Sequence, residues 1–200
     1  MVASRKIVGL GDSTTAGTPG FASPIEAPPK GRGNPESQYC YWMMRAHPEW
    51  VVLNQGINGQ RSDEILSRFQ RDVVAEKATM VIILAGVNDI YQGRTIESIK
   101  RNLEAMYESA GRNGIVAVAT TVLPYNIASR EESRSIRDLN QWIKTTSNAA
   151  GRLFCDTNLA VRDDLNPDLL ASSPDGIHPD VEGYRRMGQA LSTTLEDAGY

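Results

Sequence analysis

The 200-residue sequence has little histidine and little cysteine. Because it has only two histidines, a histidine-rich metal site is excluded, and a mechanism that needs an imidazole base must use His47 or His178. The two cysteines, Cys40 and Cys155, lie far apart in the sequence, and we expect reduced, buried thiols rather than a disulfide or a reactive site. We therefore expect neither a metal nor a cofactor.

The sequence also lacks an excess of positive charge and a long apolar run. Its net charge is −3, with acidic and basic residues mixed along the chain, which argues against nucleic acid and anionic membranes as partners. No apolar run approaches the roughly 20 residues that span a bilayer. Too few apolar residues follow Arg5 and Lys6 for a signal-peptide core, so we expect a cytoplasmic protein, although a leader already removed would leave no trace.

Short apolar runs alternate along the chain with segments of helical periodicity. The runs are apolar on both faces, as is typical of strands covered by helices on both sides. The predicted strands are Lys6–Leu10, Trp50–Asn54, Met80–Ala85, Gly114–Thr120 and Leu153–Asp156. This alternation predicts an α/β fold with a parallel sheet between two layers of helices, in one domain over residues 1–200.

The helix-periodic segments carry apolar residues at spacings of three and four. Their apolar residues span positions 65–73, 96–110 and 136–143, and a last helix is expected over Asp180–Asp197. Ser62 and Thr95 precede acidic residues and are predicted as helix N-caps.

Two long segments interrupt this pattern. Thr18–Glu36 is rich in proline and glycine, and we expect an ordered loop without regular structure that borders a pocket. The second segment is Thr157–Asp175, and both should emerge at the carboxyl edge of the sheet, where open α/β folds bind ligands. Just beyond the first segment, Tyr39, Tyr41 and Trp42 could line the pocket, but packing of the first helix against the sheet is the favoured interpretation.

The stretch KIVGLGDSTTAG, at residues 6–17, allows two interpretations. As a dinucleotide-binding turn it needs the pattern G-x-G-x-x-G, but after Gly9 and Gly11 the third position is Thr14. As a nucleophile turn it would expose Ser13 just past the first strand. A serine nucleophile needs a neighbouring base and donors for the oxyanion.

Candidates for the base and for the oxyanion donors occur beside other predicted strands and helices. Asp175 precedes His178 by three residues before the last helix, so its carboxylate can orient the imidazole. His47 has no such acid and is predicted to be a surface turn residue. Asn88, after the third strand, is either an oxyanion donor or a turn residue, and Asp89 is either functional or a cap.

At these positions the chain resembles the GDSL-type, or SGNH, hydrolases. Their four blocks occur in order as Gly11-Asp12-Ser13, Asn54-x-x-x-x-Gly59, Gly86-x-Asn88-Asp89 and Asp175-x-x-His178. Thr14 replaces the leucine that follows the serine in many members. No G-x-S-x-G occurs, which argues against the ordinary α/β-hydrolase arrangement.

The resemblance implies a role for each matched residue. Ser13 would be the nucleophile, His178 the base and Asp175 its partner. The oxyanion hole would comprise the Ser13 N–H, the Gly59 N–H and the Asn88 side chain, with Gly56 as the alternative glycine. The implied fold is a flavodoxin-like three-layer α/β/α sandwich with five parallel strands in the order 2-1-3-4-5.

The implied function is a serine esterase that hydrolyses short-chain carboxylic esters of small molecules through an acyl-serine intermediate. The alternatives within the enzyme class are a carbohydrate O-acetylesterase, and after it a lysophospholipase or thioesterase. Two non-hydrolase alternatives remain, a catalytically dead binding module on the same scaffold and a dinucleotide-binding protein. The acyl length, the alcohol and the oligomeric state are not predicted.

Overall fold

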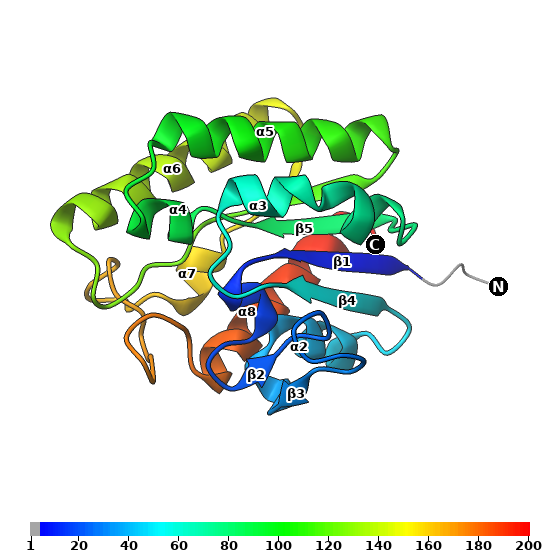
Figure 1. Cartoon of the computed structure of the whole chain (residues 1–200), viewed down its shortest axis with the longest axis horizontal. Helices are drawn as coiled ribbons and strands as arrows, with labels where there is room; N and C mark the ends of the chain where they lie inside the picture. Colours follow the sequence, from blue (N-terminus) through cyan, green and yellow to red (C-terminus); the bar gives the residue numbers. More distant parts are fainter. Residues whose placement is uncertain (1–4) are drawn as a thin grey trace.

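The computed structural model describes residues 5–200, and its centre is a sheet of five parallel strands (Figure 1). These strands are β1 (Lys6–Gly11), β4 (Val51–Gly56), β5 (Met80–Leu84), β6 (Val116–Thr120) and β7 (Leu153–Cys155). Their order is β4-β1-β5-β6-β7, which is the predicted 2-1-3-4-5 when only these strands are counted. The predicted α/β class and strand order are therefore confirmed.

Helices cover both faces of the sheet. Figure 1 shows α3 (Ser62–Ser67), α5 (Ile96–Arg112) and α6 (Arg130–Ala149) above the sheet, and α2 (Tyr39–Ala46) and α8 (Val181–Asp197) below it. The shorter elements are α1 (Ser13–Ala16), α4 (Val87–Tyr91), α7 (Thr157–Val161), η1 (Pro35–Ser37) and a π-helical turn, η2 (Gln70–Val74). Within the part of the chain that the structure describes, no helix is both long and apolar enough to cross a membrane.

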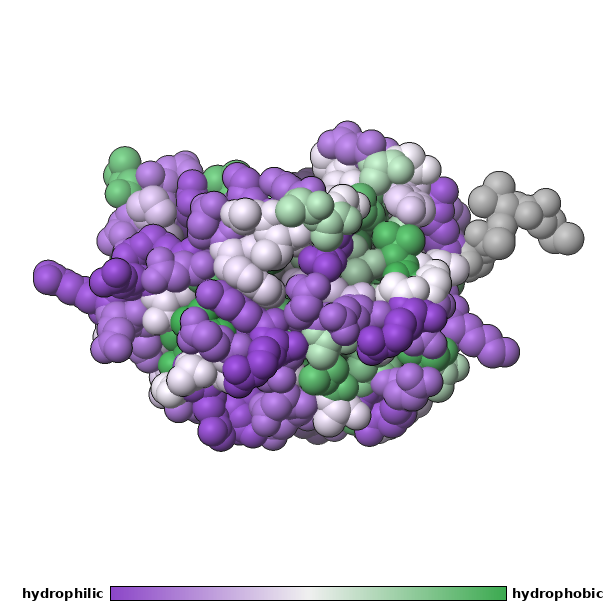
Figure 2. All heavy atoms as spheres, turned by 90° about the horizontal axis from the view of Figure 1, so that it is seen from above, coloured by the Kyte–Doolittle hydropathy of each residue, from purple (hydrophilic) through white to green (hydrophobic). Residues whose placement is uncertain are grey.

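Each face of the sheet has its own hydrophobic core. Along β1, Val8 and Leu10 join the core under α3, α5 and α6, whereas Ile7 joins the core with α2 and α8. Residues at helical spacing on α5, such as Ile99 and Leu103, enter the first core as predicted. The face seen from above, over α5, is mostly hydrophilic (Figure 2). Burial of apolar surface on both faces fixes the sheet between the helix layers.

One of the two predicted N-caps is confirmed and the other is wrong. The Thr95 side chain accepts a hydrogen bond from the backbone N–H of Ser98 (3.3 Å) at the start of α5. Ser62, however, is the first residue of α3, and Arg61 occupies the N-cap position. The Ser62 hydroxyl instead donates to the buried carboxylate of Asp89 (2.7 Å), an acceptor that sequence spacing did not reveal.

The predicted lack of regular structure in Thr18–Glu36 is also wrong. The segment forms a small antiparallel hairpin, β2 (Phe21–Ala22) and β3 (Arg32–Gly33). Its glycines allow this close pairing: Gly33 has a φ of 118°, and a Cβ there would lie 2.3 Å from the carbonyl oxygen of Gly20. In the second long segment, α7 and a bridge between Arg162 and Leu170 provide some regular structure.

The aromatic residues after the hairpin pack against the fold. Tyr39 is fully buried, and its hydroxyl donates to Oγ1 of Thr15 (3.2 Å). The indole N–H of Trp42 donates to the carbonyl oxygen of Glu36 (2.8 Å). The packing interpretation is therefore confirmed for these two residues, and the expected buried, unpaired thiols of Cys40 and Cys155 are confirmed as well.

Candidate active site

The register of the sheet aligns the carboxyl ends of β1, β4 and β5, where the first three sequence blocks lie. Gly11, the last residue of β1, lies opposite Gly56 of β4 and Leu84 of β5. Because the strands are parallel, the chain leaves the sheet at the same edge after each of them. Ser13, Gly59 and Asn88 therefore line one cavity.

Ser13 lies in a tight turn from β1 into α1. Asp12 caps this helix, because its Oδ1 accepts from the backbone N–H of Thr14 (3.0 Å). The turn needs a glycine at position 11, since a Cβ there would lie 2.2 Å from Oγ1 of Thr15. Ser13 is 7% exposed, so its hydroxyl is reachable only from the cavity.

A hydrogen-bonded relay connects Ser13 to the loop before α8. Nε2 of His178 lies 2.8 Å from Oγ of Ser13, and Nδ1 of His178 lies 2.7 Å from Oδ2 of Asp175. An ionised carboxylate only accepts, so Nδ1 carries the proton of a neutral imidazole. Nε2 is then the acceptor for the Ser13 hydroxyl, which is the tautomer that a general base requires.

Asp175 is held in its ionised form by three donors. Besides the imidazole, its Oδ1 accepts from the backbone N–H groups of Ile177 (2.9 Å) and His178 (2.8 Å). Partial burial raises the pKa of this carboxyl, but the hydrogen bonds outweigh it and lower the pKa from 3.8 to about 2. The Ser173 hydroxyl donates to the carbonyl oxygen of His178 (2.7 Å) and closes the loop.

The backbone N–H groups of Ser13 and Gly59 have no acceptor among residues 5–200. Gly59 has a φ of 73° and faces the cavity. The N–H of Gly56, in contrast, donates to Oδ1 of Asn54 (3.0 Å), and a Cβ at Gly56 would lie 2.1 Å from the nitrogen of Ala16. Gly56 is thus a close-packing position, and its N–H is already used.

The side-chain amide of Asn88 has one N–H to spare. Its Nδ2 donates to the carbonyl oxygen of Gln60 (3.0 Å), which fixes the plane of the amide beside the cavity. Because the amide nitrogen carries two hydrogens, the second is available to a ligand. Asn88 and the Ser13 and Gly59 N–H groups together provide three neutral donors around one cavity.

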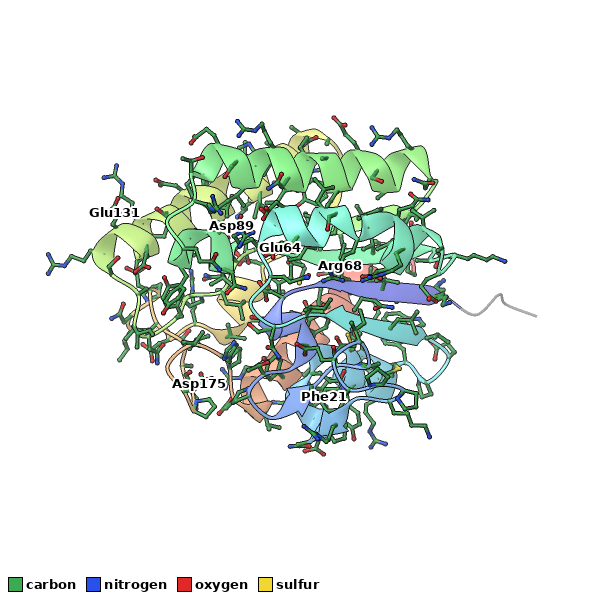
Figure 3. The ribbon with its side chains drawn as sticks, in the orientation of Figure 1. Phe21, Glu64, Arg68, Asp89, Glu131 and Asp175 are labelled. Atoms are coloured by element: carbon green, nitrogen blue, oxygen red, sulfur yellow. The ribbon has the colours of Figure 1, made fainter. Side chains whose placement is uncertain are left out.

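Asp89, the neighbour of Asn88, points away from the cavity. Its two oxygens accept from the backbone N–H and the hydroxyl of Ser62, each at 2.7 Å, so it caps α3 as the cap interpretation predicted. Burial raises the pKa of this carboxyl. In Figure 3 Asp89 lies in the layer above the sheet, whereas Asp175 lies below it.

The cavity has a volume of about 290 Å³ and two kinds of wall. The polar wall carries the groups described above together with Thr14 and Asn58. The opposite wall is apolar and aromatic, and it consists of Val87, Tyr91, Leu123, Pro124, Tyr125 and Ile177. A mostly apolar wall facing a few convergent polar groups is typical of a small-molecule site.

The apolar wall was not predicted from the sequence. Thr18–Glu36 was expected to border the pocket, but no residue of that segment lines it. The segment instead supports two lining residues: the backbone N–H of Thr18 donates to the carbonyl oxygen of Ser13 (3.1 Å), and the Glu26 carboxylate accepts from the backbone N–H and the side-chain amide of Asn58 (2.8 and 3.0 Å). The stretch Leu123–Tyr125 follows β6 at the carboxyl edge, so the edge rule applied to this fourth strand would have found it.

His47 is not part of the site. It ends α2, its side chain is 17% exposed, and its ring stacks on Trp50 with 3.8 Å between the centroids. It is therefore more closely packed than a surface turn residue. In the described residues 5–200, no group of three or more His, Cys, Asp or Glu side chains is arranged to hold a metal ion.

A family model described as the GDSL-like lipase/acylhydrolase family matches residues 10–186. The chain belongs to this family. The match contains all four sequence blocks, and a serine-centred triad and an oxyanion hole are typical of GDSL-like enzymes. The resemblance expected from the four blocks is thus confirmed, and with it a hydrolase of the esterase or acylhydrolase type.

Relatives of this GDSL-like chain include an esterase. An acetylxylan esterase of Geobacillus stearothermophilus is 27% identical over 163 residues, which are 74% of this chain and 72% of the relative. The structure of a G-D-S-L family protein from Desulfitobacterium hafniense DCB-2 has a TM-score of 0.79 and 27% identity, covering 95% of this chain and 99% of the other. The structure of the acetylxylan esterase Axe2 of G. stearothermophilus has a TM-score of 0.72 and 22% identity, covering 96% and 94%, and shows the common fold.

Proposed function

We propose that this protein is a serine esterase that hydrolyses small carboxylic esters through an acyl-serine intermediate. The observation that carries the proposal is the continuous relay from Asp175 through His178 to Ser13 at the wall of the cavity. The family membership supports the reaction class, and the three neutral donors support a tetrahedral intermediate.

In the first half of the reaction, Oγ of Ser13 attacks the ester carbonyl carbon while its proton passes to Nε2 of His178. The N–H groups of Ser13 and Gly59 and the free N–H of Asn88 donate to the oxyanion. The bond from carbon to the alcohol oxygen then breaks, and His178 gives its proton to the departing alcohol.

In the second half, a water molecule attacks the acyl-serine and His178 takes one of its protons. Collapse of the second tetrahedral intermediate releases the carboxylic acid and returns a proton to Oγ of Ser13. Through both halves the ionised Asp175 stabilises the imidazolium and keeps its Nδ1 pointing away from the substrate.

The first test combines an ester assay with a fluorophosphonate probe. Ser13→Ala should remain folded and lose p-nitrophenyl acetate hydrolysis, and the probe should label wild type at Ser13. His178→Ala should also be inactive, whereas the matched variant of the other histidine, His47→Ala, should keep its activity. Wild-type activity in Ser13→Ala, or no labelling of a folded wild-type protein, would refute the proposal and favour a dead binding scaffold.

Carbohydrate O-acetyl esters are a second candidate substrate. The acetylxylan esterase relative favours them, as does the 59% exposed Tyr91 at the cavity wall, whose ring could stack on a sugar. The apolar remainder of the wall favours a simple acyl chain instead. A panel from acetyl to octanoyl p-nitrophenyl esters, with acetylated xylo-oligosaccharides, a lysophospholipid and an acyl-CoA, discriminates among these classes.

A further inference from the structure

Arg68, which follows α3, is a buried cation with an unusual set of partners. The residue is 5% exposed, and its guanidinium donates four hydrogen bonds. Only one of them reaches a carboxylate, that of Asp72, from Nη1 at 2.7 Å. The other three reach neutral oxygens, so the contacts of Arg68 extend well beyond an ion pair with Asp72.

The three neutral acceptors lie beside the loops that carry the backbone oxyanion donors. Nη2 donates to the carbonyl oxygen of Gly11 at the end of β1 (2.7 Å), two residues before Ser13. Nη1 donates to the carbonyl oxygen of Gln55 in β4 (2.8 Å), and Nε donates to the side chain of Gln60 (2.7 Å), the residue after Gly59. Figure 3 places Arg68 between α3 and β1.

Gln60 extends this connection to the third donor. Its side chain is bound by Arg68, and its carbonyl oxygen accepts from Nδ2 of Asn88 (3.0 Å). Ser13, Gly59 and Asn88 follow three different strands, and Arg68 connects their segments directly at Gly11 and Gln60 and, through Gln60, at Asn88.

We propose that Arg68 is a positioning residue that fixes the mutual spacing of the three oxyanion donors. The proposal rests on the proposed esterase function. A planar guanidinium can hold acceptors on several sides in fixed directions, whereas a lysine ammonium on a flexible stem cannot. Displacement of one donor by about 1 Å is enough to lower a rate about 100-fold.

Arg71 provides a matched control. It also donates to Asp72, from Nε and Nη2, but it is on the protein surface with a side chain that is 66% exposed, and it makes no bond to the donor loops. If Arg68 acts only through its ion pair with Asp72, substitution of Arg68 and substitution of Arg71 should change kcat and Tm in the same way.

The experiment compares Arg68→Lys, Gln60→Leu and Arg71→Lys with wild type. It measures kcat, KM and Tm with p-nitrophenyl acetate, and rates are expressed per active site by running fluorophosphonate labelling to completion. Arg68→Lys should lose about 100-fold in kcat with KM little changed, because the donors act mainly in the transition state. Gln60→Leu, which loses a single bond to Arg68, should lose about 10-fold in kcat, and Arg71→Lys should match wild type.

The outcomes separate this inference from the proposed function. If wild type hydrolyses esters but Arg68→Lys and Gln60→Leu retain kcat, positioning by Arg68 is refuted and the esterase function stands. An equal loss in Arg71→Lys also refutes it. If Arg68→Lys does not fold, an unchanged kcat in Gln60→Leu still overturns the inference. If folded wild type hydrolyses no ester and is not labelled, both proposals fall together.

Discussion

The two sides of the candidate active site are held in place by different kinds of contact. On the donor side, Ser13, Gly59 and Asn88 follow three strands of one sheet and are fixed by backbone register and by buried contacts. On the base side, Asp175 and His178 belong to a loop before α8 that is fixed by the hydrogen bonds of one carboxylate. The donor side thus depends on the register of the sheet, whereas the base side depends mainly on hydrogen bonds within one loop.

Each side also contains an aspartate, and the two carboxyls behave in opposite ways. Asp12 is 1% exposed, accepts from Thr14 alone, and has an oxygen, Oδ2, without a partner among residues 5–200. Burial raises the pKa of Asp12 from 3.8 to about 7, whereas three donors lower that of Asp175 to about 2. At a pH between these values, such as pH 5, Asp12 is therefore protonated while Asp175 is ionised.

Asp175→Asn should break the base side with the largest effect. An asparagine can present its amide to Nδ1 and favour the wrong imidazole tautomer, so we expect kcat to fall by about 10⁴-fold. Asp180→Asn is the matched control, because asparagine remains a good N-cap for α8. A kcat within tenfold of wild type in folded Asp175→Asn would show that the base side does not need this carboxylate.

Asn88→Ala should break the donor side with a smaller effect. Two backbone donors remain, so kcat should fall by roughly 10²–10³-fold, the usual cost of one oxyanion donor. Asn102→Ala serves as control, since the Asn102 amide donates to the Ser62 hydroxyl rather than into the cavity. An unchanged kcat in Asn88→Ala would remove this residue from the proposed oxyanion hole.

Asp12→Asn should change how the free energy of unfolding depends on pH, which tests the raised pKa of Asp12. Between pH 4 and 7, folded Asp12 retains a proton that the unfolded chain has lost, so wild-type stability falls as pH rises, by on the order of 1 kcal/mol per pH unit. Asparagine keeps the bond to Thr14 but has no proton to lose. The stability of Asp12→Asn relative to wild type should therefore increase from pH 4.5 to 7.5 in urea unfolding. A constant difference would contradict a raised pKa.

The pH response of Asp175→Asn should have the opposite sign. Because the folded pKa of Asp175 is lowered, its stabilisation is complete above about pH 4 and is lost as pH falls towards 2. The difference in Tm between wild type and Asp175→Asn should accordingly shrink over that range. A difference in Tm that stays the same down to pH 2 would show that the Asp175 hydrogen bonds do not stabilise the fold.

The fold class was predictable because its signals are local, whereas the strand order was implied by the family resemblance. Apolar strands at regular intervals and helical periodicity between them determine an α/β class, and Ile99 and Leu103 faced the core as their spacing indicated. The hairpin in Thr18–Glu36 was not predictable in the same way, since proline and glycine are common in both irregular loops and tight hairpins.

The sequence by itself determined which chemistry is available: one serine turn, one Asp-x-x-His motif, and glycine and asparagine at the ends of neighbouring strands. Only the tertiary structure decided which atoms meet, because such contacts depend on the register of strands far apart in the chain. In the tertiary structure Nε2 of His178 lies against Ser13, and Arg68 binds carbonyl oxygens of two strands. The structure also shows that the N–H of Gly56 is already hydrogen-bonded, which leaves Gly59 as the candidate donor. Carbonyl acceptors are identical at every residue, so no sequence pattern can show which of them a buried guanidinium will bind.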